Sequence, residues 1–148
     1  MKRLGHFVAL LSFFALLAAC ASGGPKYKEM SQGLTTPQPG TERIWFYRTS
    51  VMGAAVQPEV KLNGETVGKA VPEGFFYVDR APGDYTVTTS TEIEKKLTFK
   101  LELGQPRYVR LDIGMGFFVG HVYAVLVDEE KAKKELDSTS YIGKTAAK

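Results

Sequence analysis

The sequence predicts an all-β domain, an antiparallel β-sandwich of about seven or eight strands with a short C-terminal helix. Three observations favour this fold class. Short runs rich in aromatic and β-branched residues recur from Glu42 onward, turn-forming residues separate these runs at close spacing, and a helix-start signal follows the last run. A small β-barrel is the competing architecture, because its strands carry the same pattern.

The first three predicted strands open the domain. Arg43–Thr49 (RIWFYRT) is dense in aromatic residues without alternation, so we expect it to be buried on both faces. Val60–Leu62 and Thr66–Gly68 flank Asn63-Gly64. This dipeptide is typical of a two-residue hairpin, because both turn positions need a positive φ.

The later strands follow the same rules. Pro82 and Gly83 favour a turn between the first two of them, because proline presets φ and glycine tolerates unusual backbone angles. Apolar and polar residues alternate most cleanly in Leu97–Leu103, which predicts a half-buried strand. The full set is Phe75–Asp79, Tyr85–Thr89, Leu97–Leu103, Val109–Ile113 and Val122–Val127.

A short helix is predicted after the last strand. Asp128 can cap a helix over Glu129–Leu136, in which acidic residues come first and lysines follow, as the helix dipole favours. We therefore place the folded domain at residues 42–137. Residues 138–148 are polar and are expected to form a frayed tail.

The first 19 residues have the pattern of a signal peptide. A basic start precedes an apolar run from Phe7 to Ala19, which is shorter than the about 20 residues of a spanning helix. The run ends in Leu17-Ala18-Ala19-Cys20, which resembles the bacterial lipobox. That resemblance implies cleavage between Ala19 and Cys20 and acylation of Cys20, with the lipid as a membrane anchor. An ordinary secretory signal and an uncleaved anchor are the alternatives.

The residue after the cysteine bears on the destination. It is Ala21 and not aspartate, which by the sorting rule of Gram-negative lipoproteins implies an outer-membrane lipoprotein facing the periplasm. The inner membrane and the cell surface stay open as alternatives. Cys20 is also the chain's single cysteine, so no intramolecular disulfide can form.

A linker is predicted between the anchor and the domain. Residues 20–41 are rich in Gly, Pro, Ser, Thr and Gln and show no apolar periodicity, which is typical of a flexible tether. A random coil of this length would hold the domain roughly 25 Å from the lipid. The alternative is that Tyr27 and Met30 dock on the domain.

Charge and motifs argue against nucleic-acid binding and catalysis. Without Lys2 and Arg3, 17 basic residues face 16 acidic ones, so no electrostatic footprint for nucleic acid remains. The mature chain has one histidine, His121, and no catalytic or metal-binding signature. Asp79, Asp84 and Asp112 could serve a hydrolase, but such acids are more often solvated or turn residues. We therefore predict no enzyme activity, no metal and no cofactor.

Two groups of apolar residues are candidate ligand or partner contacts. Three glycines bracket Met115, Phe117 and Phe118 in the stretch Gly114–Gly120, which reads either as an exposed contact loop, against protein or membrane, or as a bulge with the side chains packed inward.

Trp45 and Tyr47 form the second group. Aromatic faces of this kind can stack on sugar rings, and this is the basis for a glycan-binding alternative. Because both residues lie inside a predicted strand, core packing is the competing interpretation.

Three motifs together resemble a known family. They are RIWFYR at residues 43–48, PEVKLNGETVG at residues 58–68 and FFYVDRAPGDYTV at residues 75–87. In this order they are similar to bacterial proteins with domain of unknown function 2846, which are typically small lipoproteins or envelope proteins. The last motif also resembles prealbumin-like sandwich modules of carboxypeptidases and surface proteins. The resemblance implies a sandwich in the envelope and transfers no catalytic residue.

These observations favour a lipid-anchored, non-enzymatic envelope module. The partners expected are membrane lipid, through acylated Cys20, and another envelope protein that the module binds or supports. A lipoprotein that binds glycan, peptidoglycan or a small ligand is the alternative, and a hydrolase is the third reading.

Overall fold

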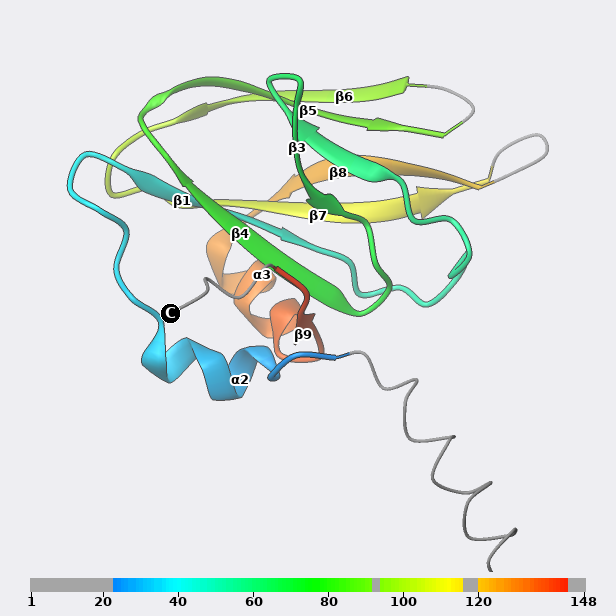
Figure 1. Ribbon diagram of the computed structural model, residues 1–148, viewed down its shortest axis with the longest axis horizontal. Helices are drawn as coiled ribbons and strands as arrows, with labels where there is room; N and C mark the ends of the chain where they lie inside the picture. The colour runs from blue at the N-terminus through cyan, green and yellow to red at the C-terminus, as the bar shows by residue number, and fades with distance from the viewer. Residues whose placement is uncertain (1–22, 92–93, 116–119, 144–148) are drawn as a thin grey trace, which may run out of the picture.

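The computed structural model describes residues 23–91, 94–115 and 120–143, which form two β-sheets packed face to face with helices on one outer face (Figure 1). The larger sheet has the order β8-β7-β1-β4-β9 and the smaller one β3-β2-β5-β6. The strands are β1 (Glu42–Tyr47), β2 (Glu59–Leu62), β3 (Glu65–Lys69), β4 (Gly74–Arg80), β5 (Gly83–Ser90), β6 (Glu94–Leu101), β7 (Arg107–Gly114), β8 (His121–Val127) and β9 (Ser140–Tyr141). The helices are α2 (Tyr27–Met30), the 3-10 turn η2 (Ser31–Gly33) and α3 (Glu129–Leu136).

The predicted sandwich is confirmed, but one of its sheets is mixed. The smaller sheet is antiparallel throughout. In the larger sheet β1 runs parallel to β7, and β4 runs parallel to β9. Apolar alternation reports which face of a strand is buried and not the direction of its neighbour, so the sequence pattern carried no sign of these parallel pairs.

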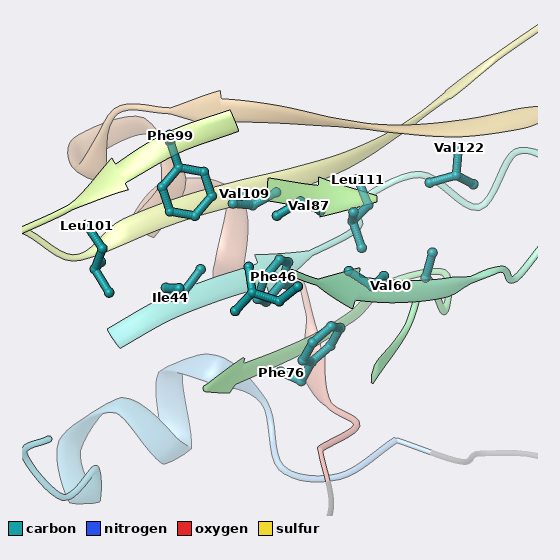
Figure 2. Packing of buried hydrophobic residues seen from close by; sticks show 12 residues of the cluster. Ile44, Phe46, Val60, Phe76, Val87, Phe99, Leu101, Val109, Leu111 and Val122 are labelled. Atoms are coloured by element: carbon teal, nitrogen blue, oxygen red, sulfur yellow. The ribbon is translucent and has the colours of Figure 1, made fainter. Parts of the chain in front are cut away.

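The strand β1 is buried on both faces, as predicted. Ile44 and Phe46 point into the core between the sheets, where they meet residues of both (Figure 2). Trp45 and Tyr47 point the other way, into a second cluster under the helices. A strand with a core on each side needs a continuous apolar run, which residues 44–47 (IWFY) supply.

The Asn63-Gly64 hairpin is confirmed. Asn63 has φ 48° and Gly64 φ 87°, the pair of positive angles that this turn requires. The Asn63 side chain also accepts a bond from the N–H of Thr86 (2.8 Å) and donates one to the carbonyl of Asp84 (3.2 Å). The turn therefore ties the hairpin to the neighbouring strand β5.

The helix α3 has the predicted bounds. The carboxylate of Asp128 accepts a bond from the N–H of Lys131 (2.9 Å) and so caps the first turn. Ala132 and Leu136 are the buried residues of the helix, and both belong to the cluster that holds Trp45 and Tyr47.

The end of the described chain is packed and not frayed. We predicted a polar tail for residues 138–148, but Thr139 is fully buried and β9 pairs with the start of β4. The N–H of Ser140 donates to the carbonyl of Glu73 and that of Ile142 to Phe75, both at 2.8 Å. These are main-chain bonds, which the polar composition of the segment does not reveal.

The flexible-tether prediction is wrong for the described part of residues 20–41. Tyr27 is 7% exposed, and its ring packs edge-to-face on Trp45 (5.6 Å) and Phe75 (5.5 Å). Gly24 and Tyr27 donate N–H bonds to the carbonyls of Tyr141 and Thr139 (3.0 and 3.1 Å). The docked alternative therefore holds, because one aromatic anchor and paired main-chain groups outweigh a linker-like composition.

Two smaller findings complete the description. The alternating strand predicted over Leu97–Leu103 ends at Leu101, and Leu103 is 56% exposed in the turn that follows. Within the residues described, no helix has the length and apolar character needed to cross a membrane.

Candidate functional site

Two loops bring the most exposed large apolar side chains of the described residues to one end of the sandwich. Val51 is 61%, Met52 67% and Met115 91% exposed. Val51 and Met52 lie between β1 and β2, and Met115 lies between β7 and β8 (Figure 1). The loops meet at Ile113, against which a Cβ on Gly53 would collide. We call Val51, Met52 and Met115 the apolar end.

A buried arginine holds the first of these loops from inside. Arg48 follows β1 and is fully buried. Its guanidinium uses all five N–H donors, and each donates to a backbone carbonyl at 2.5 to 3.1 Å. The acceptors are the carbonyls of Ser50, Met52, Gly53, Val56 and Ala70. Burial lowers the pKa of Arg48, but a guanidinium stays charged in proteins.

Several backbone groups of the loop have partners inside the protein. Besides the arginine bonds, the N–H of Met52 donates to the hydroxyl of Ser50 (3.1 Å), and the N–H of Val56 donates to the carbonyl of Gly53 (2.9 Å). The side chains of Val51 and Met52 project outward from a loop that these bonds hold in place. This geometry presents apolar surface in one fixed shape.

The predicted contact residues divide into three groups. Met115 is exposed, as the contact-loop interpretation of Gly114–Gly120 requires. Phe117 and Phe118 lie outside the described residues, as do Ala19 and Cys20. Trp45 and Tyr47 are 5% and 0% exposed, so the prediction that they contact a ligand is wrong.

The burial of Trp45 has a clear cause. The outer face of the larger sheet is covered by α2 and α3. Four members of the cluster around Trp45 come from the segments predicted as linker and tail: Tyr27, Met30, Leu34 and Tyr141. Arg43 closes the cluster at one side, with its guanidinium 4.0 Å from the Tyr77 ring and 5.6 Å from the Trp45 ring. No aromatic face of Trp45 is left for a sugar.

The candidate hydrolase acids have structural partners. Asp79 accepts a two-pronged bond from Arg43 (2.7 and 2.9 Å), and Asp112 accepts one from Arg110 (2.7 and 2.9 Å). Such forks are typical of fixed ion pairs. Asp84 is the second residue of β5, where its carbonyl accepts the bond from Asn63. His121 is half-buried at the start of β8.

A second ion-pair network fastens α3 to the larger sheet. The Tyr47 hydroxyl donates to Glu135 (2.7 Å), and Arg110 donates to the other oxygen of that carboxylate (2.8 Å). Burial, and next the bond to Glu135, raise the pKa of Tyr47 above its ordinary value. The network joins β1, β7 and α3. It explains why Glu135, a charged residue of the helix, points toward the sheet.

The described part of the surface also has open grooves away from the apolar end. Among the described side chains, no group of three or more His, Cys, Asp or Glu residues is arranged to hold a metal ion. One groove, of about 550 Å³, runs between β3 and β4 and includes Val67 and Val78. The other, of about 630 Å³, lies beside the β6–β7 turn and includes Gln105 and Leu126. Neither includes a residue of the apolar end.

Comparison with known proteins places the chain in a family. The model of a family described as protein of unknown function (DUF2846) matches residues 38–122. The chain belongs to the DUF2846 family. The match spans β1 to the start of β8, so this DUF2846 protein carries Arg48, both loops of the apolar end and the Asn-Gly hairpin within the family region.

One relative has a longer match than the family model. An uncharacterized protein of Haemophilus influenzae (strain ATCC 51907 / DSM 11121 / KW20 / Rd) is 26% identical over 140 residues. The alignment covers 92% of this chain and 83% of the relative. No solved structure matches significantly.

The sequence signal for this site was incomplete. The glycine bracket pointed to Met115, but nothing singled out Val51 and Met52, which sit in a short apolar stretch without periodicity. Arg48 was read as part of a strand. Its role depends on carbonyls as distant as Ala70, which only the fold brings together.

Proposed function

We propose that this DUF2846 protein is a lipid-anchored, non-enzymatic module of the cell envelope that binds or supports another envelope protein. Its anchor is Cys20, at the end of the lipobox-like Leu17-Ala18-Ala19-Cys20. The observation that carries the proposal is the docking of the segment that follows. Gly24 and Tyr27 are hydrogen-bonded into the domain, so lipid on Cys20 would hold the whole domain and not a loose extension.

A binding role agrees with what the described side chains do. Asp79 and Asp112 are each held by an arginine, and the conspicuous tryptophan and tyrosine of β1 stabilise the core. Surfaces that a protein partner could use are the two open grooves, of which the one between β3 and β4 lies along strand edges.

The proposed location is the periplasmic face of the outer membrane. Its support is Ala21, which stands where an aspartate would favour retention in the inner membrane. Three acyl chains on one residue would hold the protein stably, since two lipid signals already suffice for anchoring.

Two measurements on the full chain test the anchor. Mass spectrometry of the purified protein should give an N-terminal peptide that begins at acylated Cys20, and the protein should fractionate with outer membranes. The Cys20→Ser chain should keep its leader and lose the acyl mass. A mature protein that starts elsewhere, or a Cys20 without acyl groups, would refute the anchor.

Site-specific crosslinking tests the partner. A photo-crosslinking residue is introduced at Val67 in one groove, at Gln105 in the other, or at Lys61, an exposed position outside both grooves. We expect one recurrent protein adduct from a groove position in intact cells, absent from the Lys61 control and from the Cys20→Ser background. If acylated protein gives no groove-specific adduct, the binding role is wrong although the anchor stands.

A further inference from the structure

The N-terminal segment joins the domain at the same end as the apolar end. The N–H of Gly24 donates to the carbonyl of Tyr141 in β9 (3.0 Å), and β9 pairs with β4 at Gly74. The carbonyl of Gly74 accepts the N–H of Arg48 (3.0 Å), the residue that holds Met52. Figure 1 shows the same arrangement, with the N-terminal segment reaching β9 where β4 begins and β1 ends.

The chain between this point and the proposed lipid is short. Cys20 precedes Gly24 by four positions. Each extended residue spans at most about 3.6 Å, so the Cys20 Cα lies within about 14 Å of Gly24. An anchored chain therefore cannot hold this end of the sandwich far from the bilayer.

We propose that the apolar end lies against the lipid surface beside Cys20, with Val51, Met52 and Met115 in the interfacial layer. This inference rests on the proposed acylation of Cys20 and adds the orientation of the domain to it. The opposite end, with the turn between β6 and β7, then faces away from the membrane.

The construction of the β1–β2 loop suits a lipid environment. Backbone groups that leave water need internal partners, because the interior of a bilayer offers none. Arg48 supplies them for the carbonyls of Ser50, Met52, Gly53 and Val56. What the loop turns outward is apolar, and an exposed set of this kind marks a contact with protein or membrane. Of these two contacts we choose the membrane, because the proposed lipid on Cys20 lies close to this end of the sandwich.

The test uses nitroxide labels on the full, acylated chain. Because acylation consumes the thiol of Cys20, the chain's single cysteine, an introduced cysteine is the only labelling site. Labels are placed by Met52→Cys and Met115→Cys, and by Leu103→Cys as the matched control. Leu103 has comparable exposure (56%), and it belongs to the turn between β6 and β7, which lies at the opposite end of the sandwich in Figure 1. The proteins are reconstituted in vesicles of phosphatidylethanolamine and phosphatidylglycerol, and collisions with oxygen and with a water-soluble nickel complex are compared.

We expect the labels at positions 52 and 115 to lie about 5–10 Å into the boundary between headgroups and acyl chains, and the label at 103 to stay in water. Acylated protein with all three labels equally water-accessible would overturn the membrane contact and leave the anchor intact. Labels at 52 and 115 that are shielded only in native envelopes, and not in pure vesicles, would also overturn it in favour of a protein partner. A Cys20 found without acyl groups by mass would refute the anchor and this inference together.

Discussion

At the scale of single residues, Arg48 shows how a charge is kept inside a small domain by backbone carbonyls. A buried ion is costly unless other dipoles replace its water shell. Here five carbonyl oxygens surround the guanidinium, and its planar fork suits several fixed acceptors at once. The same bonds define the loop from Ser50 to Val56, so one side chain serves both the core and the surface.

Replacing Arg48 should destabilise the protein and loosen that loop. Arg48→Met removes the donor from five carbonyls, of which that of Ala70 is in a buried bond, and we expect a loss of about 3 kcal/mol in the free energy of unfolding. Arg48→Lys keeps the charge but offers three donors for five acceptors, so it should fall between Met and wild type. Urea unfolding followed by Trp45 fluorescence measures both.

The control for this pair is Arg107→Met. Arg107 lies in the half-exposed start of β7 and donates to the carbonyl of Lys100 (2.8 Å). We expect a change of about 0.5 kcal/mol or less at this site. Equal losses in the free energy of unfolding for Arg48→Met and Arg107→Met would mean that the five carbonyl bonds of Arg48 stabilise the protein no more than an ordinary surface contact.

At the scale of elements, the sequence predicted what local pattern can carry. The strands from β1 to β8 follow from aromatic runs, alternation and turn residues, and α3 follows from Asp128 and the charges after it. The segments at 24–34 and 138–142 were misread because their order comes from remote contacts. Neither Tyr27 nor Thr139 has a local pattern that announces its buried partner.

The same limit applies to the candidate site. Met115 could be predicted as a contact residue from the glycines around it. Val51 and Met52 could not, because only the fold brings their loop against Ile113, next to the loop of Met115. The contact prediction for Trp45 and Tyr47 failed at the level of elements, since the segments that cover them were taken for linker and tail.

The docking of the N-terminal segment should depend on Tyr27. Tyr27→Ala removes an aromatic ring that packs on Trp45 and Phe75, and truncations of this kind cost about 3–5 kcal/mol when the ring is fully buried. Because the lost contact is local to the segment, we expect the segment to detach while the sandwich stays folded. Emission of Trp45, the single tryptophan, should shift to the red, and iodide should quench it more strongly.

Tyr123→Ala is the matched control, because Tyr123 is half-buried on β8 and its ring packs beside that of His121. It should leave the Trp45 emission unchanged. An unchanged spectrum for Tyr27→Ala as well would show that the segment is held by its main-chain bonds alone.

At the scale of the whole molecule, the two cores differ in chemistry. The core between the sheets is aliphatic and phenylalanine-rich, whereas the cluster under the helices contains most of the buried tyrosine. Burial raises the pKa of Tyr27, Tyr47, Tyr108 and Tyr141 above the ordinary value near 10. The tyrosines of the second core therefore make the stability of the protein depend on pH in the alkaline range.

The sign of this dependence follows from linkage. Above about pH 10 the unfolded chain loses tyrosine protons that the folded chain still holds, so the free energy of unfolding should fall as pH rises from there. Below that pH these groups contribute no slope. Absorbance of tyrosinate at 295 nm, recorded with circular dichroism, should show a late group of tyrosines that ionises only with unfolding.

Tyr47→Phe provides the internal comparison. The substitution removes one tyrosine with a raised pKa, together with its bond to Glu135. The free energy of unfolding should then fall less steeply as the pH rises above about 10. If all seven tyrosines of the chain titrate together near pH 10 with the fold intact, the inference from burial is wrong.

The place of β1 also sets an order of events when the chain folds. It is the earliest strand of the domain, yet it lies in the middle of the larger sheet, and its parallel partner begins only at Arg107. The hairpins formed in between, β2–β3 and β5–β6, belong to the other sheet. Closing so long a loop slows folding, because its entropy is lost before any contact compensates it. The antiparallel pair of β1 with β4 can form earlier, but the larger sheet is complete only when the last third of the chain has been made. If the proposed leader directs export, the chain would still be incompletely folded late in synthesis, which is the state that a narrow translocation channel admits.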